Sequence, residues 1–494
     1  MSREASLASL RRLAPLVPVA CALFAWAPLL DNYFKDDDFV HLYDLSTKPF
    51  LRLLVLPWGG HVYTVRNTVF DVMFRLFGTD PRPYLWSALL THGLNALLLY
   101  GVIRRFAGSV VLACFGATLW AASPVLEEAL GWYSVYGQVL LTAIVLGVLW
   151  SLGDKVTTGA VVTTRTALCW AALLLAGSTC FGIGLGVALA FPVVTPLALA
   201  RRQLPMRSLV ILVTGAAASY AFYRLVITYS PDVTGAEAQL FSAATALRAL
   251  PAVLAFVAGL FGFGTAALGF DFVGAHVHFP ASMGVLGGAV LLGTVLAGLI
   301  CGPATARRRI LALALLAVAA YGTIAAGRAI LFIATHTPLW GAVMSSRYQY
   351  LGLSVVTLIV CTALAQVAAL GTTAKWIVLA TTAAWTVVRI AVLVVRPFPI
   401  DHWDSERTGT MAMLSSIQQQ IASTPPGQVV LIENQPFGLS RGFPASFPGW
   451  AGMFVVFFPD NTVDGRPVRF LVSEDDWQRA QARGGRIAAL VTRR

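Results

Sequence analysis

Residues 31–95 of the chain read DNYFKDDDFVHLYDLSTKPFLRLLVLPWGGHVYTVRNTVFDVMFRLFGTDPRPYLWSALLTHGLN. This stretch begins where a first apolar run ends and finishes inside a second one. It contains three consecutive acids (Asp36, Asp37 and Asp38), three histidines and four arginines, whereas most of the remaining chain is apolar. Ionisable residues gathered beside a membrane span indicate a functional site. The alternative is a solvated loop between two helices, held by its own ion pairs.

The composition indicates a polytopic membrane protein. The 494 residues are 57% hydrophobic and only 12% charged, with a mean hydropathy of +0.74, which is typical of chains that cross a bilayer many times. The net charge of +12 lies in short arginine clusters between apolar runs, at 11–12, 104–105, 201–202 and 307–309. This is the positive-inside pattern. A nucleic-acid-binding stripe would need a soluble surface, so no nucleic-acid partner is expected.

We expect an α-helical membrane domain over residues 1–397, with about 11 spans, or 12 to 13 if one further run crosses. Its N-terminus is predicted to be cytoplasmic, and its first apolar run is predicted to be an uncleaved anchor in the cell membrane. The run over 166–200 is broken at Phe181–Gly184, which predicts a tight hairpin. The predicted spans are 13–30, 83–103, 108–123, 137–152, 166–180, 183–200, 208–228, 283–301, 310–331, 350–370 and 376–395.

If one further apolar run, 247–269, were counted as a span, the basic clusters after it would lie on the opposite side from those before it. Its glycines suit a bend, so we expect a re-entrant hairpin, a segment lying in the interface, or two short half-helices. In each case residues 229–282 begin and end outside. If the run crosses once, every later element changes sides.

Residues 398–494 differ in composition and predict a small soluble α/β domain on the extracytoplasmic face. No phosphate loop, metal spacing or nucleophile motif occurs in it. We therefore expect a lid or packing module. The predicted strands are 428–433, 453–458, 467–472 and 486–492, and the predicted helices are 405–422 and 474–483.

Three groups of polar residues fall on the predicted outer side. The aspartate triplet in the first loop (31–82) could accept a proton or bind a divalent ion. Glu127 and Glu128 lie in the next outer turn, so the two acidic patches predict a shared cavity. Arg347 precedes a late span, where it either snorkels or holds a phosphate.

No metal site is expected from the remaining residues. His276 and His278 form a HVH pair without an obvious third ligand. The six cysteines lie in or beside apolar runs and contain no CxxC, so we expect neither disulfides nor a metal. Whether a divalent cation assists stays open.

Residues 67–77 are amphipathic. Val69, Val72 and Leu76 share one side at helical spacing, and Asn67 and Asp71 point away from it. The pattern suits a helix in the plane of the membrane interface. A soluble-type helix packed on the bundle is the alternative.

The sequence resembles the polytopic glycosyltransferases of the GT-C superfamily, in particular the branch of protein O-mannosyltransferases and their bacterial relatives. The resemblance rests on four stretches. They are the acidic motif Asp36–Phe39, GGHVYTVRNTVFDVMFRLFG (59–78) with YLWSALLTHGLNALLLY (84–100), SPVLEEALGWYSVYGQ (123–138) and SSRYQY (345–350). Thr64–Arg66 stands where relatives commonly carry a proline.

The resemblance implies transfer of a sugar from a polyprenyl-phosphate carrier to a hydroxyl or amine of a glycan, lipid or protein acceptor on the extracytoplasmic face, without a required cofactor. It implies an aspartate base, which we assign to Asp37, with Asp36 as the second choice and Asp38 completing the motif. The carrier phosphate would be held by Arg347, assisted by Arg66 or Lys35.

On the acceptor side, the resemblance implies that Glu127 or Glu128 shapes the cavity and that His61 and Tyr348 line it. Two other functions remain open. A transporter or flippase of a lipid-linked or anionic substrate usually has repeats and ionisable residues near the midplane, and neither is evident here. A non-catalytic membrane scaffold would bind a partner through 398–494.

Overall fold

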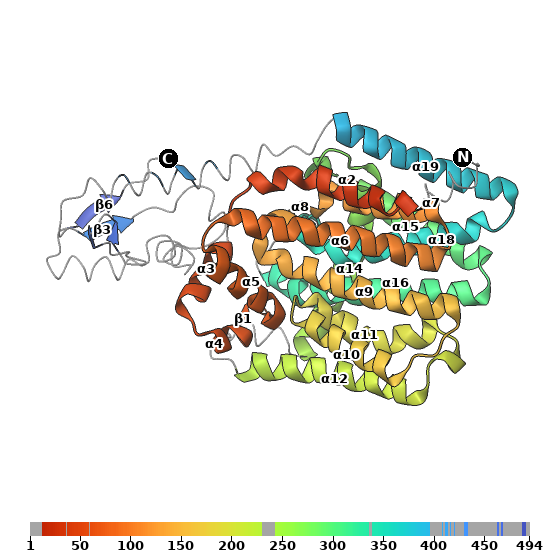
Figure 1. The fold of residues 1–494 in the computed structure, drawn as a ribbon, viewed down its shortest axis with the longest axis horizontal. Coiled ribbons are helices and arrows are strands. Elements are labelled where there is room, and N and C mark those ends of the chain that lie inside the picture. The colour runs from red at the N-terminus through yellow and green to blue at the C-terminus, as the bar shows by residue number, and fades with distance from the viewer. Residues whose placement is uncertain are drawn as a thin grey trace.

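The computed structural model describes residues 12–35, 37–58, 60–229, 243–334 and 338–395, with short separate pieces after residue 395. Long helices run side by side, and a group of short helices caps one end of the bundle (Figure 1). We call the end that carries α3 (Asp37–Thr47), α4 (Phe50–Leu54) and α5 (Thr64–Phe77) the loop end.

Eight described helices are long and apolar enough to cross a membrane, or nine if α7 (Val110–Ala121) and the bent segment Pro124–Gly131 form one span. The predicted multi-pass helical fold is therefore confirmed, but the count of 11 spans is not. Three predicted spans coincide with helices of only 11, 15 and 16 residues, below the roughly 20 that a bilayer requires. The short helices are α2 (Leu16–Trp26), α10 (Thr164–Ser178) and α11 (Ile183–Ala198); the eight are α6 (Pro81–Ala107), α9 (Tyr136–Thr158), α12 (Met206–Tyr229), α14 (Ala243–Phe270), α15 (Ala281–Cys301), α16 (Ala304–Ala334), α18 (Tyr350–Ala368) and α19 (Thr372–Val395).

Local sequence signals set the helix ends that frame the loop end. Asp80 caps α6 by accepting the backbone N–H of Arg82 at 3.1 Å, and Pro81 occupies its first turn. Gly108, at φ +70°, ends α6 in the left-handed conformation that favours glycine. The hairpin predicted at Phe181–Gly184 is confirmed, because α10 ends at Ser178 and α11 begins at Ile183.

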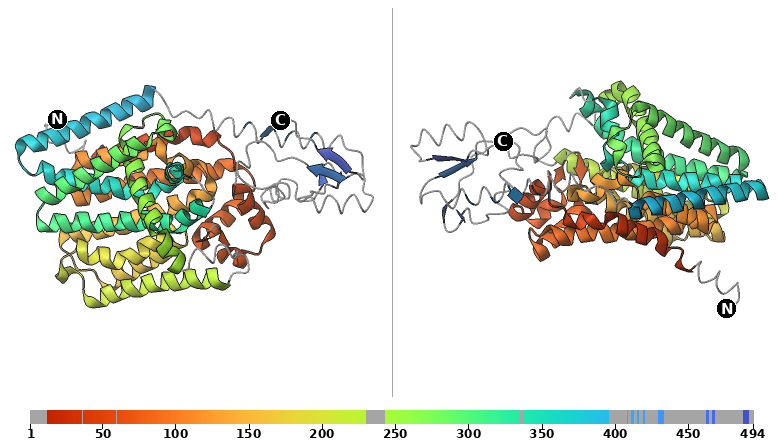
Figure 2. Two further views of the ribbon diagram at one scale, coloured as in Figure 1. Left: turned by 180° about the vertical axis from the view of Figure 1, so that it is seen from behind. Right: turned by 90° about the horizontal axis from the view of Figure 1, so that it is seen from above.

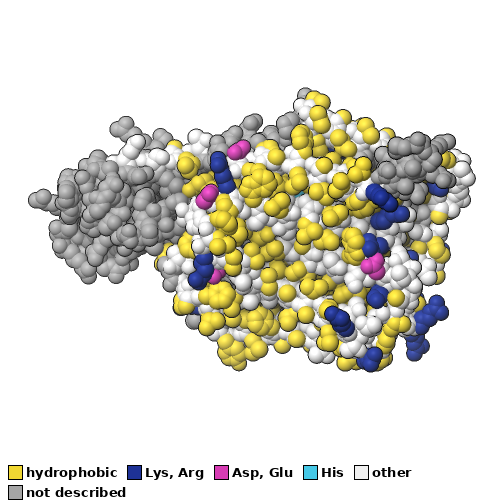
Figure 3. All heavy atoms as spheres, in the orientation of Figure 1, with side chains coloured by type: hydrophobic (Ala, Val, Ile, Leu, Met, Phe, Trp, Pro, Cys, Tyr) yellow, Lys and Arg dark blue, Asp and Glu magenta, His cyan; other side chains and the backbone are white. Residues whose placement is uncertain are grey.

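The arginine clusters meet at the end of the bundle opposite the loop end. Gln203 Nε2 donates to Lys155 O at 2.7 Å, and Arg308 Nη2 donates to Leu199 O at 2.9 Å. In Figure 3, lysine and arginine side chains gather toward one end of a face that is otherwise largely hydrophobic. The clusters at 201–202 and 307–309 therefore lie at the same end as Lys155, while the common side of all four clusters and its assignment to the cytoplasm remain predictions.

Helix α14 is continuous through 247–269, so the predicted re-entrant hairpin and pair of half-helices are wrong. The rear view in Figure 2 (left) shows it crossing the bundle at a steep angle to the neighbouring long helices. Its contacts lie near the loop end. The Phe256 ring is 6.2 Å from that of Tyr348, and Leu260 O accepts from Gln349 Nε2 at 3.3 Å. The segment along the membrane and the single crossing both remain predictions, because Ala249–Phe270 is also long and apolar enough to cross a membrane.

Between α4 and α5 the chain forms a small hairpin of β1 (Pro57–Trp58) and β2 (His61–Val62). Gly60 makes the turn possible at φ +80°. The Tyr223 hydroxyl, from α12, accepts from Val62 N at 3.0 Å and donates to Gly60 O at 3.1 Å. Trp58 and His61 are directly paired, so their side chains share one face of the hairpin.

Helix α5 buries its polar side and exposes its apolar side. Asn67 and Asp71 are buried, whereas Val72, Leu76 and Phe77 are exposed, Leu76 to 68%. A soluble-type helix would bury these apolar residues, so their exposure favours the in-plane helix, and both interpretations stay predictions. An apolar outer face beside a membrane bundle fits the predicted in-plane helix.

Most of residues 398–494 lies outside the described residues, so the α/β domain remains a prediction. Two described strands, β3 (Val429–Ile432) and β6 (Ile487–Leu490), pair in parallel and coincide with predicted strands. A short antiparallel pair joins β4 (Thr462–Val463) and β5 (Arg466–Pro467).

Candidate active site

The two described aspartates of the triplet, Asp37 and Asp38, begin α3. Asp37 and Asp38 occupy the first turn of this helix, where the helix dipole favours a negative charge. Asp36 lies outside the described residues. The two described carboxylates have different surroundings.

Asp38 is fully engaged by the protein. It is 1% exposed, and its Oδ1 accepts both the backbone N–H and the hydroxyl of Ser134 at 2.6 Å. Its Oδ2 accepts the backbone N–H of Lys35 at 3.0 Å. Burial raises the pKa of Asp38 to about 6, against the opposing effect of the Ser134 hydrogen bonds. Asp38 therefore ties α3 to the loop before α9 and has little capacity left for a substrate.

Asp37 retains an unused oxygen. Its Oδ1 is buried and has no hydrogen-bond partner among the described residues. Burial raises the pKa of Asp37, while the Arg347 charge, a hydrogen bond from Trp58 and the Arg66 charge oppose that rise. A carboxylate with a raised pKa and a vacant acceptor can take up a proton.

Arg66 lies behind the aspartates and is 1% exposed. Its Nη1 donates to Ser134 O at 2.9 Å, and its Nη2 donates to Asn67 Oδ1 at 2.8 Å. The same two nitrogens lie 3.0 and 3.1 Å from the ring nitrogens of His41, and the guanidinium covers the Tyr63 ring at 3.8 Å. Its donors are thus turned toward protein atoms, which favours a structural charge over a phosphate ligand.

Arg347 approaches Asp37 from η6 (Ser346–Tyr348). No carboxylate among the described residues lies within the 4.0 Å ion-pair distance of its guanidinium. Its backbone N–H and the Ser345 hydroxyl both donate to Glu128 Oε2 at 2.9 Å. The predicted meeting of the second acidic pair with the late arginine is therefore present, as a link between η6 and α8 (Glu127–Gly131).

His61 lies on the hairpin beside Phe181, with ring centroids 4.5 Å apart. Neither ring nitrogen has a hydrogen-bond partner among the described residues. Burial, then the charges of Arg328 and Arg66, lower the pKa of His61 well below its ordinary value, so the ring is neutral. Arg328 also lowers the pKa of Asp37, which places its charge at this site.

The other predicted site residues are also near this end. The charge of Lys35 lowers the pKa of Asp38, and the backbone N–H of Lys35 donates to Asp38 Oδ2. Glu127 begins α8, and Tyr348 is buried beside Arg347. Sequence reasoning missed Trp58 as a neighbour of Asp37. A tryptophan after a proline carries no signal for such a contact.

No group of three His, Cys, Asp or Glu side chains in the described part of the chain could hold a metal ion. The Nδ1 of His276 is 2.6 Å from Asp271 Oδ2, and this ring is buried, whereas His278 is exposed. The two histidines of the HVH pair therefore do not face a common metal position.

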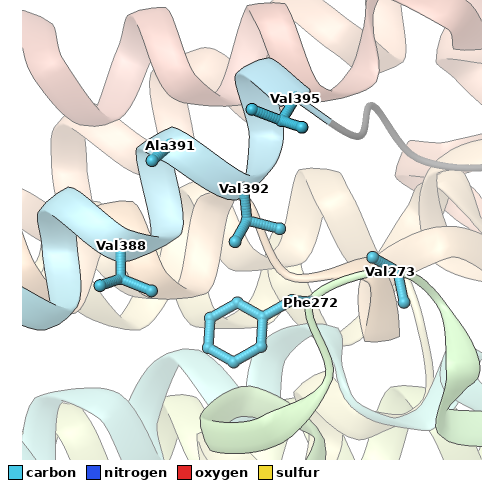
Figure 4. A pocket seen from close by; sticks show the side chains of 6 residues that line it. All are labelled: Phe272, Val273, Val388, Ala391, Val392 and Val395. Atoms are coloured by element: carbon cyan, nitrogen blue, oxygen red, sulfur yellow. The ribbon is translucent and has the colours of Figure 1, made fainter.

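A cavity of about 490 Å³ lies between α19 and the loop after α14 (Figure 4). Its lining side chains, Phe272, Val273, Val388, Ala391, Val392 and Val395, are all apolar. They offer no group that could activate or orient a polar substrate, so the chemistry is assigned to the Asp37 region.

No family model and no curated protein matches the sequence. Among solved structures, the chain is similar to ArnT from Cupriavidus metallidurans bound to undecaprenyl phosphate, with 15% identity, a TM-score of 0.41, and coverage of 97% of this chain and 96% of that one. It is also similar to the oligosaccharyltransferase AglB from Archaeoglobus fulgidus in complex with an inhibitory peptide and a dolichol-phosphate. That match has 15% identity and a TM-score of 0.39, and it covers 92% of this chain and 64% of the AglB chain. These values are too low to assign a function, which rests on the residues of this chain.

Proposed function

We propose that this protein is a membrane glycosyltransferase that moves a sugar from a polyprenyl-phosphate carrier to a hydroxyl or amine of an acceptor. One observation supports this most. The unused Oδ1 of Asp37 lies in the field of Arg347, whose guanidinium has no carboxylate partner among the described residues. A base beside a cation that makes no direct ion pair suits a reaction that removes a proton and releases an anion.

In the proposed reaction the acceptor O–H or N–H gives its proton to Asp37. The acceptor atom bonds to C1 of the sugar, and the bond between C1 and the phosphate oxygen breaks. The electron pair remains on the phosphate, where Arg347 stabilises the charge. Burial raises the pKa of Asp37 toward the range in which a carboxylate is an efficient base.

The exposed apolar side of α5 supports a lipid-linked donor. Val72, Leu76 and Phe77 face outward beside the site, while Asn67 on the same helix faces the protein. A carrier lying in the outer leaflet would therefore meet an apolar surface next to the polar site. Glu128 orients the backbone of Arg347 in this scheme, and His61 lines the acceptor side.

The family branch, the sugar and the extracytoplasmic location are parts of this proposal. The test is reconstitution of the purified chain in proteoliposomes with a panel of polyprenyl-phosphate sugars and candidate acceptors. We expect polyprenyl phosphate and a glycosylated acceptor to appear together. Translocation of the intact lipid-linked sugar without cleavage would instead identify a flippase.

A further inference from the structure

Two buried hydrogen-bond donors without partners lie at the candidate phosphate site. Trp132 is 8% exposed and Tyr348 is 3% exposed. The indole Nε1 is buried and has no hydrogen-bond partner among the described residues. The phenol oxygen of Tyr348 is buried too; the Arg347 guanidinium approaches it as a donor, and the phenol hydrogen finds no acceptor among the described residues. A buried donor left unsatisfied costs about 1–3 kcal/mol, so two of them around one group require an explanation.

Both rings are arranged around Arg347. The guanidinium carbon is 5.2 Å from the centroid of Trp132 and 5.2 Å from that of Tyr348, which is within the range of cation–π attraction. The segments that carry the rings are linked, because Glu128 N donates to Ser346 Oγ at 3.1 Å. The two donors and the cation are therefore held together by the fold.

We propose that Trp132 Nε1–H and Tyr348 O–H donate, together with Arg347, to the phosphate oxygens of the lipid carrier. The inference rests on the proposed function and defines the phosphate end of its donor site. Phosphate oxygens only accept hydrogen bonds, and this cluster presents a cation and two vacant donors. A sugar hydroxyl would also need an acceptor. Neutral donors add affinity without a second buried charge.

Buried water is the competing explanation for the unpartnered donors. Water would satisfy both groups without a ligand, and removing either donor would then leave carrier binding unchanged. A phosphate ligand makes each donor contribute to affinity. Carrier binding therefore distinguishes the two explanations.

The experiment uses the full chain in nanodiscs and measures the Kd for polyprenyl monophosphate by native mass spectrometry, with inorganic phosphate as a second probe. Trp132→Phe and Tyr348→Phe each retain a ring beside Arg347 and remove one donor. We expect each to weaken binding by about 10–100-fold, since one hydrogen bond to a charged group contributes about 1.5–3 kcal/mol. Trp120→Phe and Tyr136→Phe, whose bonds go to Tyr350 O and Thr91, are matched controls expected to bind normally.

The results separate this inference from the proposed function. Normal binding by both donor variants, with weak binding by Arg347→Gln, overturns the inference and leaves the glycosyltransferase proposal intact. Normal binding by all three variants overturns both. Weakened carrier binding by all three variants, together with no sugar transfer by the unaltered protein, supports the phosphate site and refutes the transferase. Equal binding of inorganic phosphate would show that the site takes free phosphate, which also overturns a carrier site.

Discussion

Replacing Tyr223 by phenylalanine should loosen the hairpin that carries Trp58 and His61. The Tyr223 hydroxyl from α12 accepts from Val62 N and donates to Gly60 O, at 3.0 and 3.1 Å. Tyr223 lies 161 residues from Val62 in the sequence, so this link joins a membrane helix to the loop. Its removal leaves the hairpin without its hydrogen bonds to α12.

The magnitude follows from the two bonds. Each contributes about 1 kcal/mol net, so the hairpin should lose about 2 kcal/mol against local opening. Since 1.4 kcal/mol corresponds to a factor of ten, the backbone amides of residues 58–63 should exchange about 30-fold faster. Sugar transfer should also fall, because Trp58 hydrogen-bonds Asp37.

Hydrogen–deuterium exchange by mass spectrometry measures this directly. Tyr220→Phe is the matched control, because Tyr220 lies on the same helix and is 51% exposed. In Tyr220→Phe, the hairpin amides should exchange at the rate of the unaltered protein. Unchanged exchange in Tyr223→Phe would refute the assignment of Tyr223 as the support of the hairpin.

Three further predictions test the surroundings of the site. Arg347→Gln removes the largest charge that lowers the pKa of Asp37, so the acidic limb of the pH–rate profile should move to higher pH; an unmoved limb contradicts this. Asp38 binds its proton more tightly in the folded state, with a pKa of about 6, so the free energy of unfolding should fall as pH rises from about 4 to about 6. Asp38→Asn should flatten that slope in thermal unfolding, and an unchanged slope counts against the burial. Gly182→Ala would place a Cβ in steric clash with His61 Nδ1 and should destabilise by about 1–3 kcal/mol, whereas Gly322→Ala, with open space around it, should melt normally.

The sequence was sufficient to predict the helical membrane fold and the common side of its polar groups. Apolar runs and arginine clusters are local signals, and they predicted that the aspartate loop, Glu128 and Arg347 lie at one end. The structure brings them there, with Glu128 bonded to the backbone of Arg347.

The separate environments of the aspartates could not be predicted, because they depend on distant contacts. Asp38 is held by Ser134, which is 96 residues away. Adjacent residues on a helix point in different directions, so Asp37 does not share this partner. No pattern in the acidic triplet distinguishes the two.

The orientation of α5 also required the structure. Periodicity shows that the helix has an apolar side and a polar side, but it does not say which side meets the protein. In water the apolar side would be buried. Here the apolar residues Val72 and Leu76 face outward and Asp71 is buried, as expected where the outside is lipid. The glycines of 247–269 suggested a bend, but α14 is continuous. Glycines suit bends and close helix contacts equally, so the sequence did not distinguish the two.

The central claim is that Asp37 is the base of sugar transfer, and its most direct test is the transfer rate of Asp37→Asn with a polyprenyl-phosphate sugar donor. We predict a loss of about 10²–10⁴-fold, with carrier binding and thermal stability retained, because the lost oxygen has no partner among the described residues. Asp44→Asn is the control, since Asp44 lies on the same helix and pairs with Lys48 at 2.9 Å; it should transfer normally. Full activity of Asp37→Asn would contradict the account.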